Sequence, residues 1–304
     1  MRVCLMIEGQ EGVTWDEWVA LARAAEDAGL EGLFRSDHYS AIIRPVAGAL
    51  DAWTTLAGLA AVTDRIRLGT LVSPATFRHP SVLARMAVTV DHISGGRVEL
   101  GMGAGWFDRD HSENGFPFLD PRRRFDLFAE QVEVVVRSWT EGGFDHEGAS
   151  YALRDQNALP RSLQQPHLPL ILGGRAKPRS AALAARFADE YNTLGAPLDE
   201  LERRGRRLDD ACAAIAREPT TLVHSLMTTC VVGRDAAEVA KRRRRVEDLT
   251  AAPLGEEDLI GTVDELIERF AALEAVGIRR VFLQHLDHRD LDAVAEMAAL
   301  VRAA

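Results

Sequence analysis

Proton-handling residues stand directly after a short apolar segment of this chain. In "FRSDHY", residues 34 to 39, Phe34 is followed within four positions by Ser36, Asp37 and His38. An imidazole exchanges protons near neutral pH, and a neighbouring carboxylate can orient it. We take His38 as the candidate general acid or base and Asp37 as its candidate orienting partner. In the alternative, structural interpretation, His38 caps the following segment or bonds a nearby carbonyl group.

Two glycine-containing segments could bind a ligand. "GAG" at 103 to 105 could let the backbone approach a ligand closely, because glycine has no Cβ. "GGR" at 173 to 175 precedes a predicted helix, so its amides and guanidinium could bind a phosphate. Both segments could instead be tight turns, and the tryptophan after "GAG" could be a core residue. The candidate binding residues are Ala104, Gly105, Trp106, Gly173, Gly174 and Arg175.

A histidine-rich segment raises the possibility of a metal site. "HLDHRD" at 285 to 290 contains His285 and His288 on either side of Asp287. This spacing is a weak metal signal in a loop, and no known carboxylate motif accompanies it. We therefore predict no metal, with the two histidines at a substrate mouth or facing solvent.

Composition limits the classes of protein that this chain can be. The formal net charge of −10 argues against a nucleic-acid binder, because such proteins need clustered positive charge. The basic run at 241 to 248 has acidic neighbours at helical spacing, which predicts ion pairs on a solvated helix face. Three scattered cysteines do not form a disulfide framework and fit a reducing cytoplasm. No stretch approaches the ~20 apolar residues of a membrane helix, so we expect a small-molecule partner and no membrane.

Strand-like and helix-like segments alternate along the first third of the chain. Strands are expected at 2 to 8, 29 to 36, 65 to 73 and 97 to 105. Thr14 and Glu17 form a predicted capping box for the first helix, and Asp51 is the predicted cap of the second, which runs through Val62. This alternation is typical of a parallel sheet covered by helices.

A longer segment, about 106 to 165, interrupts the alternation, and we interpret it as an insertion within a single domain. It contains a predicted helix from Pro121 to Trp139 with one apolar face. Four further strands are expected at 168 to 174, 189 to 195, 225 to 233 and 279 to 285, with a capping box at Thr262 and Glu265. Eight units predict an α/β fold of the (β/α)8 TIM-barrel type with an insertion after strand four. An open doubly wound sheet is the alternative, but "EGQEGV" does not match its glycine fingerprint.

The barrel interpretation explains the position of the polar residues. Active sites of this fold lie at the C-terminal ends of the strands. His38, "GAG" and "GGR" all follow predicted strands, so we expect them at the same end of the barrel. Glu8 and Asn192 also follow or end predicted strands.

Several segments resemble the luciferase-like monooxygenase superfamily, in particular its branch of deazaflavin (coenzyme F420)-dependent oxidoreductases. The resemblance is carried by "WDEWVALARAAEDAGLEGLFRSDHY", by "RIRLGTLVSPATFRHPSVLARMAVTVDHISGGRVELGMGAGWF", by "ILGG" and by "FADEYN". It covers nearly the whole chain, is dense from 14 to 107 and thins between 196 and 260. The block from "SPATFRHP" to "GAGW" is specific, whereas "SDH" alone is not.

The resemblance implies a barrel with an insertion after strand four, a homodimer, and a flavin or deazaflavin over the strand ends. In related deazaflavin enzymes a cis peptide bond that does not involve proline backs the ring, and the matching positions are Leu71, Val72 and Ser73. His38 would lie beside the reactive carbon, and Asp37 would orient it or contact the cofactor. Trp106 replaces a functional glutamate of the related sugar-phosphate dehydrogenases, and no lysine lies near 192 to 197. Glucose 6-phosphate is therefore not the expected substrate.

The expected function is hydride transfer between coenzyme F420 and an unidentified small organic substrate. One alternative is a monooxygenase that uses reduced FMN and oxygen in the same fold. A second is a barrel that binds a flavin or deazaflavin without catalysis. The segment 245 to 260 could be a lid over the site or an ordinary surface loop.

Overall fold

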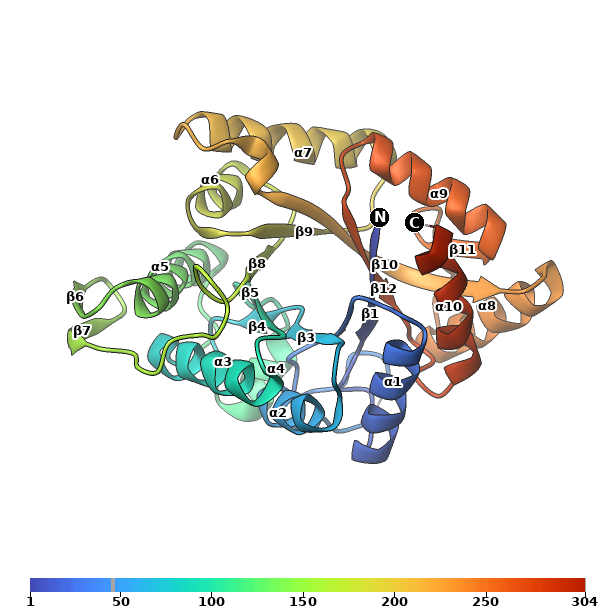
Figure 1. Cartoon of the computed structure of the whole chain (residues 1–304), viewed down its shortest axis with the longest axis horizontal. Helices are drawn as coiled ribbons and strands as arrows, with labels where there is room; N and C mark the ends of the chain where they lie inside the picture. Colours follow the sequence, from blue (N-terminus) through green and yellow to red (C-terminus); the bar gives the residue numbers. More distant parts are fainter. Residues whose placement is uncertain (45–46, 304) are drawn as a thin grey trace.

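In the computed structural model, which describes residues 1–44 and 47–303, eight parallel strands close into a barrel (Figure 1). The barrel strands follow the order β1, β2, β3, β5, β8, β9, β10, β12, and pairing of β12 with β1 completes the ring. Helices surround this ring on the outside (Figure 1). The predicted TIM-barrel class is therefore confirmed.

The strands of the barrel are β1 (Arg2–Ile7), β2 (Gly32–Arg35), β3 (Arg67–Thr70), β5 (Val98–Gly103), β8 (Leu170–Gly173), β9 (Glu190–Leu194), β10 (Val223–Gly233) and β12 (Arg280–Gln284). The other strands are β4 (Ser73–Pro74), β6 (Phe144–Glu147), β7 (Ala152–Gln156) and β11 (Leu259–Thr262). The helices are α1 (Trp15–Asp27), α2 (Ala52–Val62), α3 (Pro80–Ser94), α4 (Asp108–Asn114), α5 (Pro121–Thr140), α6 (Pro178–Phe187), α7 (Leu198–Ala213), α8 (Ala236–Thr250), α9 (Val263–Ala275) and α10 (Leu291–Ala303). A short 3-10 helix covers Pro219–Thr221.

The predicted helix caps are present. The Thr14 side chain accepts from the Glu17 amide while the Glu17 carboxylate accepts from the Thr14 amide, and Thr262 and Glu265 repeat this arrangement at α9. Asp51 caps α2 by accepting from the amide of Thr54 at 2.9 Å. These contacts satisfy amide groups that have no partner within the first helical turn. The sequence signals for helix starts were therefore reliable.

The predicted third strand, residues 65 to 73, is divided in the structure. β3 ends at Thr70 and β4 begins at Ser73, and between them the Leu71–Val72 peptide bond is cis. β4 pairs with β5 through Ser73 and Met102. The predicted single strand is therefore two strands at the rim of the barrel. The sequence pattern of residues 65 to 73 did not indicate this break.

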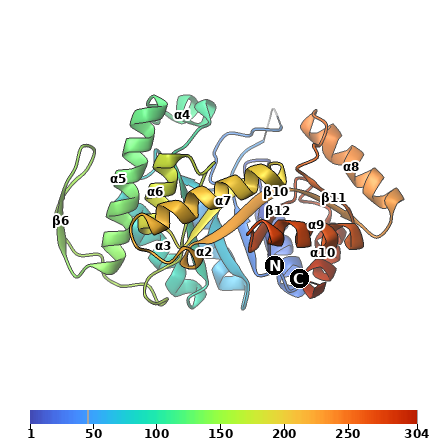
Figure 2. The ribbon, with the colours of Figure 1, turned by 90° about the horizontal axis from the view of Figure 1, so that it is seen from above.

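The segment from 106 to 165 is only partly additional to the barrel. α5 lies between α3 and α6 in the helix ring (Figure 1) and buries its predicted apolar face, including Phe128, Val132 and Val135. It therefore occupies the place of the fourth barrel helix. The additional parts are α4 before it and the antiparallel hairpin β6–β7 after it, which extends outside the helix ring (Figures 1 and 2).

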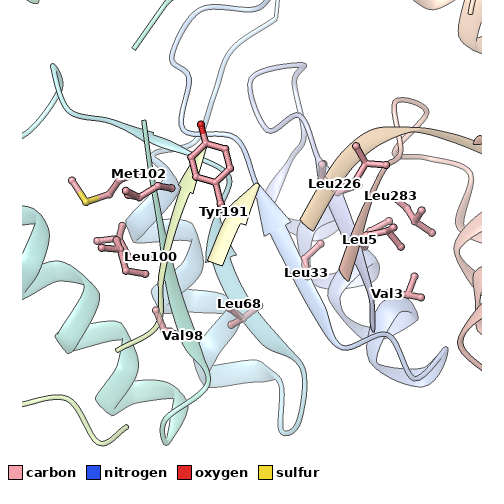
Figure 3. Packing of buried hydrophobic residues seen from close by; sticks show 14 of the residues in the cluster. Val3, Leu5, Leu33, Leu68, Val98, Leu100, Met102, Tyr191, Leu226 and Leu283 are labelled. Carbon is pink, nitrogen blue, oxygen red and sulfur yellow. The ribbon is translucent and has the colours of Figure 1, made fainter. Parts of the chain in front are cut away.

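Two apolar layers follow from the alternation of side chains along each strand. Outward residues such as Leu5, Leu33 and Leu68 pack between the strands and the helices (Figure 3). Inward residues, including Met6, Phe34 and Phe282, fill the barrel interior. Phe34 and Phe282 meet edge to face with ring centroids 4.8 Å apart. The barrel interior is therefore packed with apolar side chains.

A buried ion cluster closes the N-terminal end of the barrel. The Arg280 guanidinium, 1% exposed, donates to Glu99 at 2.7 Å and to Glu190 at 2.9 Å. Loss of one partner from such a cluster would leave an uncompensated charge away from water. This cluster joins β5, β9 and β12 at the N-terminal end of the barrel. The candidate site lies at the other end.

The C-terminal part of the chain departs from simple alternation. β10 continues beyond the barrel, where Cys230 to Gly233 pair in parallel with the unpredicted strand β11. Residues 245 to 250 belong to α8, and 259 and 260 belong to β11. The possible lid at 245 to 260 is therefore loop only from 251 to 258. In α8 the predicted pairs form, as Arg242 contacts Glu238 at 3.4 Å and Arg243 contacts Glu247 at 2.9 Å. The predicted solvated position is wrong for Arg242, which is buried and also binds Glu296 at 2.7 Å.

Exposed apolar side chains share a face of the neighbouring helices α2 and α3 with the exposed side chains of Arg85 and Thr89. α2 contains no charged residue, and Val62 is exposed at its end. On α3, Val82 and Ile93 are exposed and lie three helical turns apart, so they share one face. No helix within residues 1–44 and 47–303 has the length and apolarity needed to cross a bilayer.

We predict that a second copy of the chain covers the α2–α3 face. The substitution Val82→Asp would place an unpaired charge in this interface and should raise the dimer dissociation constant at least about tenfold. Sedimentation velocity at several concentrations measures this change. Ile215→Asp, at an exposed position beyond α7, is the matched control and should sediment as wild type. A wild-type monomer at all concentrations would rule out the interface.

Candidate active site

Predicted site residues from four separate segments meet at the C-terminal rim of the barrel, which we call the mouth. His38 follows β2, Val72 lies between β3 and β4, Trp106 follows β5, and Gly173 ends β8. The His38 ring lies 6.0 Å from the Trp106 ring between centroids. Val72 lies close to Gly173. A Cβ atom added to Gly173 would lie 3.2 Å from a methyl group of Val72. Barrel closure therefore brings these residues together.

The His38 side chain is oriented by a carboxylate that the sequence analysis did not single out. Its Nδ1 lies 2.5 Å from Oδ2 of Asp110, which is on α4. The other nitrogen, Nε2, has no hydrogen-bond partner among the described residues. With Nδ1–H held by Asp110, Nε2 is the atom that can accept or donate a proton. Asp37, the predicted orienting residue, does not contact the ring.

The charge state of His38 follows from opposing effects. Burial lowers its pKa, but the hydrogen bond to Asp110 and the negative charges of Glu8, Asp110 and Asp37 outweigh burial. The pKa of His38 is therefore raised above its ordinary value. The protonated imidazole persists to a higher pH than in a free histidine, which suits a group that gives up or receives a proton near neutrality.

Two carboxylates also hold the segment that follows His38. Oδ1 of Asp110 accepts from the amides of Tyr39 at 3.0 Å and Ser40 at 2.7 Å. Glu11, 2% exposed, accepts from three consecutive amides, those of residues 42 to 44, at 2.7 to 2.9 Å. The backbone beside His38 is thus fixed by side chains from α4 and from the loop after β1. Asp110 performs two tasks, because one oxygen orients the imidazole and the other holds the chain that carries it.

Asp37 belongs to a buried ion network rather than to an open surface. Arg78 binds it with both terminal nitrogens, at 2.6 and 3.1 Å, and the Ser73 hydroxyl donates to it at 2.6 Å. Arg78 also binds Asp51 at 2.8 Å. Asp37 is 1% exposed. Through Arg78, its contacts link the end of β2 to the residues just before α2 and α3. Ser73, another predicted cofactor residue, is fully buried in the same network.

Val72 occupies a notch made by glycines of the neighbouring strands. A Cβ at Gly103 would lie 2.5 Å from Val72, and one at Gly101 would lie 2.1 Å from the Thr70 carbonyl oxygen. The close backbone approach predicted for "GAG" thus exists at Gly103, but its occupant is the chain's own Val72. Leu71 packs into the barrel interior. The cis peptide bond implied by the resemblance lies between Leu71 and Val72.

The turn after β5 presents an aromatic pair at the mouth. Gly105 has a φ of +79°, which favours glycine, and a Cβ there would meet the Thr76 hydroxyl at 2.9 Å. Ala104 is half-buried against the outer core. Trp106 is 63% exposed and contacts Phe107, whose ring lies 5.9 Å from His38. The structural alternative for Trp106, a core residue, is wrong.

The "GGR" turn leads directly into α6. Gly174 has a φ of +159°, and the Tyr191 hydroxyl lies under the turn, accepting from the Ala176 amide at 2.9 Å. No side chain in the described chain caps the N-terminus of α6. Arg175 is exposed and has no hydrogen bond or ion pair among the described residues. Free amides and an unpaired guanidinium can bind an anion here.

A chain of polar side chains from β1, β2, β10 and β12 continues around the mouth from the His38 segment. Glu8 accepts from the amide groups of Gln284 at 2.5 Å and Gln10 at 2.8 Å. Ser36 donates to Gln10 at 2.5 Å, and the Thr229 hydroxyl contacts Gln284 at 3.1 Å. The sequence analysis placed Glu8 at this end but missed both glutamines. Their positions just after β1 and at the end of β12 were the available signal.

The histidines of "HLDHRD" have structural partners. The ring nitrogen Nε2 of His285 lies 3.1 Å from the Asp290 carbonyl oxygen, and burial lowers the pKa of His285 to about 4. His288 is buried, with Nε2 3.7 Å from Glu17. Neither histidine faces solvent. Among residues 1–44 and 47–303, no group of three or more His, Cys, Asp or Glu side chains is arranged to hold a metal ion.

Comparison with known proteins agrees with this geometry. A family model described as luciferase-like monooxygenase matches residues 2–257. An uncharacterized protein of Mycobacterium tuberculosis is 30% identical over 215 residues, which cover 66% of this chain and 74% of that protein. The FMNH2-dependent dimethylsulfone monooxygenase of Pseudomonas putida is 25% identical over 253 residues, covering 72% of this chain and 69% of that enzyme.

A solved structure supports the same conclusion at the level of fold. An F420-dependent secondary alcohol dehydrogenase, in complex with an F420-acetone adduct, has a TM-score of 0.85 at 17% identity. The match covers 99% of this chain and 98% of the dehydrogenase. The shared fold and the family match over most of the sequence lead to one assignment. The chain belongs to the luciferase-like monooxygenase family.

Proposed function

We propose that this chain is an F420-dependent oxidoreductase that transfers a hydride between the deazaflavin and a small organic substrate. The observation that carries the proposal is the unpaired Nε2 of His38 at the mouth, held by Asp110 and close to exposed aromatic rings. The named enzymes of this family catalyse oxidoreductions, which supports an enzymatic function for this chain. The similar proteins include an F420-dependent and an FMNH2-dependent enzyme. A flavin or deazaflavin cofactor is therefore common to this proposal and to a monooxygenase that uses FMN.

The residues of the mouth fit such a cofactor. Val72, backed by glycines at 101, 103 and 173, offers an apolar surface for one face of a planar ring. Gln284, half-buried at the end of β12, carries an amide group suited to the polar edge of that ring, and Gln10 is buried behind it. Arg175 and the uncapped N-terminus of α6 would hold the phosphate. Local binding of this kind would retain an anionic cofactor on an acidic protein.

His38 would hold or move the proton that accompanies the redox step. When bound, a deazaflavin supplies hydride transfer and reacts poorly with oxygen, because carbon replaces the reactive ring nitrogen. A hydride delivered to a carbonyl or imine carbon leaves a basic atom that needs a proton. Nε2 of His38 is available to donate it, or to accept it in the reverse direction. Asp110 would stabilise the charged imidazole throughout.

A monooxygenase that uses reduced FMN is the second candidate. The observation in its favour is the sequence match to the FMNH2-dependent enzyme of Pseudomonas putida over 72% of this chain. The same notch and phosphate site would serve FMN. A barrel that binds the cofactor without catalysis is the third candidate, and it differs from the others because it requires nothing of His38.

A fluorescence titration with oxidised F420 and, in parallel, FMN tests the cofactor directly. We expect micromolar binding of F420 and at least about tenfold weaker binding of FMN. Arg175→Ala should weaken F420 binding about tenfold by removing the unpaired cation, whereas Arg186→Ala, in the last turn of α6 beside Glu133, is the matched control. The opposite cofactor preference would favour the monooxygenase, and failure of both cofactors to bind would refute both proposals.

Replacement of His38 by alanine separates catalysis from binding. His38→Ala should lower turnover by ~100-fold while the cofactor affinity stays within about tenfold, because the imidazole acts on a proton and not on the cofactor phosphate. Steady-state rates and the same titration measure the two quantities. His146→Ala, in the remote hairpin β6–β7, is the control. Unchanged turnover in His38→Ala would favour the non-catalytic candidate.

Asp110→Asn should lower the pKa of His38 and shift the active pH range. The carboxylate stabilises the imidazolium, so its neutral replacement makes the ring lose its proton at a lower pH. We expect the corresponding limb of the kcat/KM profile to move to lower pH, with turnover reduced about tenfold or more. Histidine ring NMR shifts report the same pKa without substrate. Asp108→Asn, at an exposed position of α4, is the control and should change neither the pKa of His38 nor turnover. Equal pKa values of His38 in Asp110→Asn and wild type would show that Asp110 does not set this pKa.

A further inference from the structure

An exposed aromatic surface at the mouth is not explained by the contacts within the chain. Trp106 is 63% exposed, the largest exposure among the large apolar side chains that the structure describes as exposed. Its ring lies 5.3 Å from Phe107 and 6.0 Å from His38. A large aromatic surface beside a proton-transferring group is suited to stack against a planar molecule.

The orientation of this surface is set by the chain around it. Gly105 makes the turn after β5 at positive φ, and Phe107 is the first flanking residue of α4. The same short helix carries Asp110, which holds His38. The turn after β5 and the helix α4 therefore hold Trp106, Phe107 and His38 close together. A ring stacked on Trp106 would have an atom within reach of Nε2 of His38.

The charge of the region restricts what can stack there. Three negative charges act on His38. Two of them are paired, Asp110 with His38 itself and Asp37 with Arg78, which leaves Glu8. Glu8 is half-buried, and its described hydrogen bonds go to the neutral amides of Gln10 and Gln284. Its negative charge therefore has no cation as a direct partner in the described chain. An anionic group would be repelled here.

The nearby arginines do not reverse this field. Arg78 is committed to Asp37 and Asp51, and Arg109 pairs with Glu113 at 3.0 Å. Arg175 is unpaired, but it lies at the "GGR" turn that we assign to the cofactor phosphate. The uncompensated charge of Glu8 near His38 is therefore separate in role from the anion-binding turn.

We infer that Trp106 forms the wall of the substrate site and that the substrate is a planar aromatic compound, neutral or positively charged. This inference rests on the proposed function, because it assigns the cofactor to the Val72 notch and leaves Trp106 to the substrate. A cation gains from both the indole face and the carboxylate of Glu8, whereas an anion gains from neither.

Three probes with one ring system and different charges test the inference. They are 1-naphthylmethylamine, 1-naphthylmethanol and 1-naphthoate, titrated by calorimetry at pH 7 into protein without cofactor. We expect the amine to bind tightest and the anion at least about tenfold more weakly than the alcohol. Trp106→Ala should weaken the amine and the alcohol about tenfold, and Trp106→Phe should restore most of the loss. Ile215→Ala, an exposed apolar position remote from the mouth, is the matched control.

A second variant separates the charge effect from stacking. Glu8→Gln should remove the preference for the amine over the alcohol while leaving the affinity for the alcohol within about twofold. Tighter binding of the anion, or equal binding in Trp106→Ala and wild type, would overturn the inference.

Cofactor titration of the same variants separates failure of this inference from failure of the proposed function. We expect Trp106→Ala to bind F420 within about threefold of wild type. A large loss of F420 affinity in Trp106→Ala, or competition between F420 and the alcohol, would show that the cofactor occupies the wall. That result would refute the substrate assignment and leave the cofactor assignment intact. Binding of the probes without binding of either cofactor would instead refute the proposed function.

Discussion

Closure of eight parallel strands into one ring is the constraint on which the other features depend. Once the ring closes, alternate residues of every strand must point into the barrel or out toward the helices. β12 shows the consequence, because Arg280 enters the buried ion cluster, Phe282 enters the interior core, and Gln284 reaches the mouth. Val281 and Leu283, between them, pack in the outer layer. One strand thus contributes to the base, the core and the site.

The parts of the fold that depend on local pattern were predictable from the sequence. Capping residues such as Thr14 and Thr262, and the apolar face of α5, determine helices within a few turns, and they appear as predicted. The barrel rim follows from strand order alone, so placing His38 there needed no knowledge of side-chain contacts. β11 was missed because it is short and depends on pairing with the extended end of β10.

The parts of the site that depend on distant contacts were not predictable in the same way. Asp110 is 72 positions from His38 and lies on a short helix without an apolar period. Asp37 is adjacent to His38 in sequence, but neighbouring residues of an extended segment point in different directions, and its partner is Arg78. The glycines of β5 could be recognised as sites of close approach. Their occupant, Val72, could be known only from the path of the chain between β3 and β4.

The glycine notch around Val72 has a consequence for how this enzyme could diversify. Any side chain at Gly101 or Gly103 would collide with the backbone or with Val72, so these positions tolerate little change. The hairpin β6–β7 lies outside the barrel strands and carries no such restriction, and the turn after β5 and α4 are restricted mainly at Gly105 and Asp110. Laboratory evolution of substrate range should therefore recover productive variants in those segments, while libraries in the notch should yield mostly inactive protein. The architecture thereby keeps the glycine notch apart from the segments that can vary.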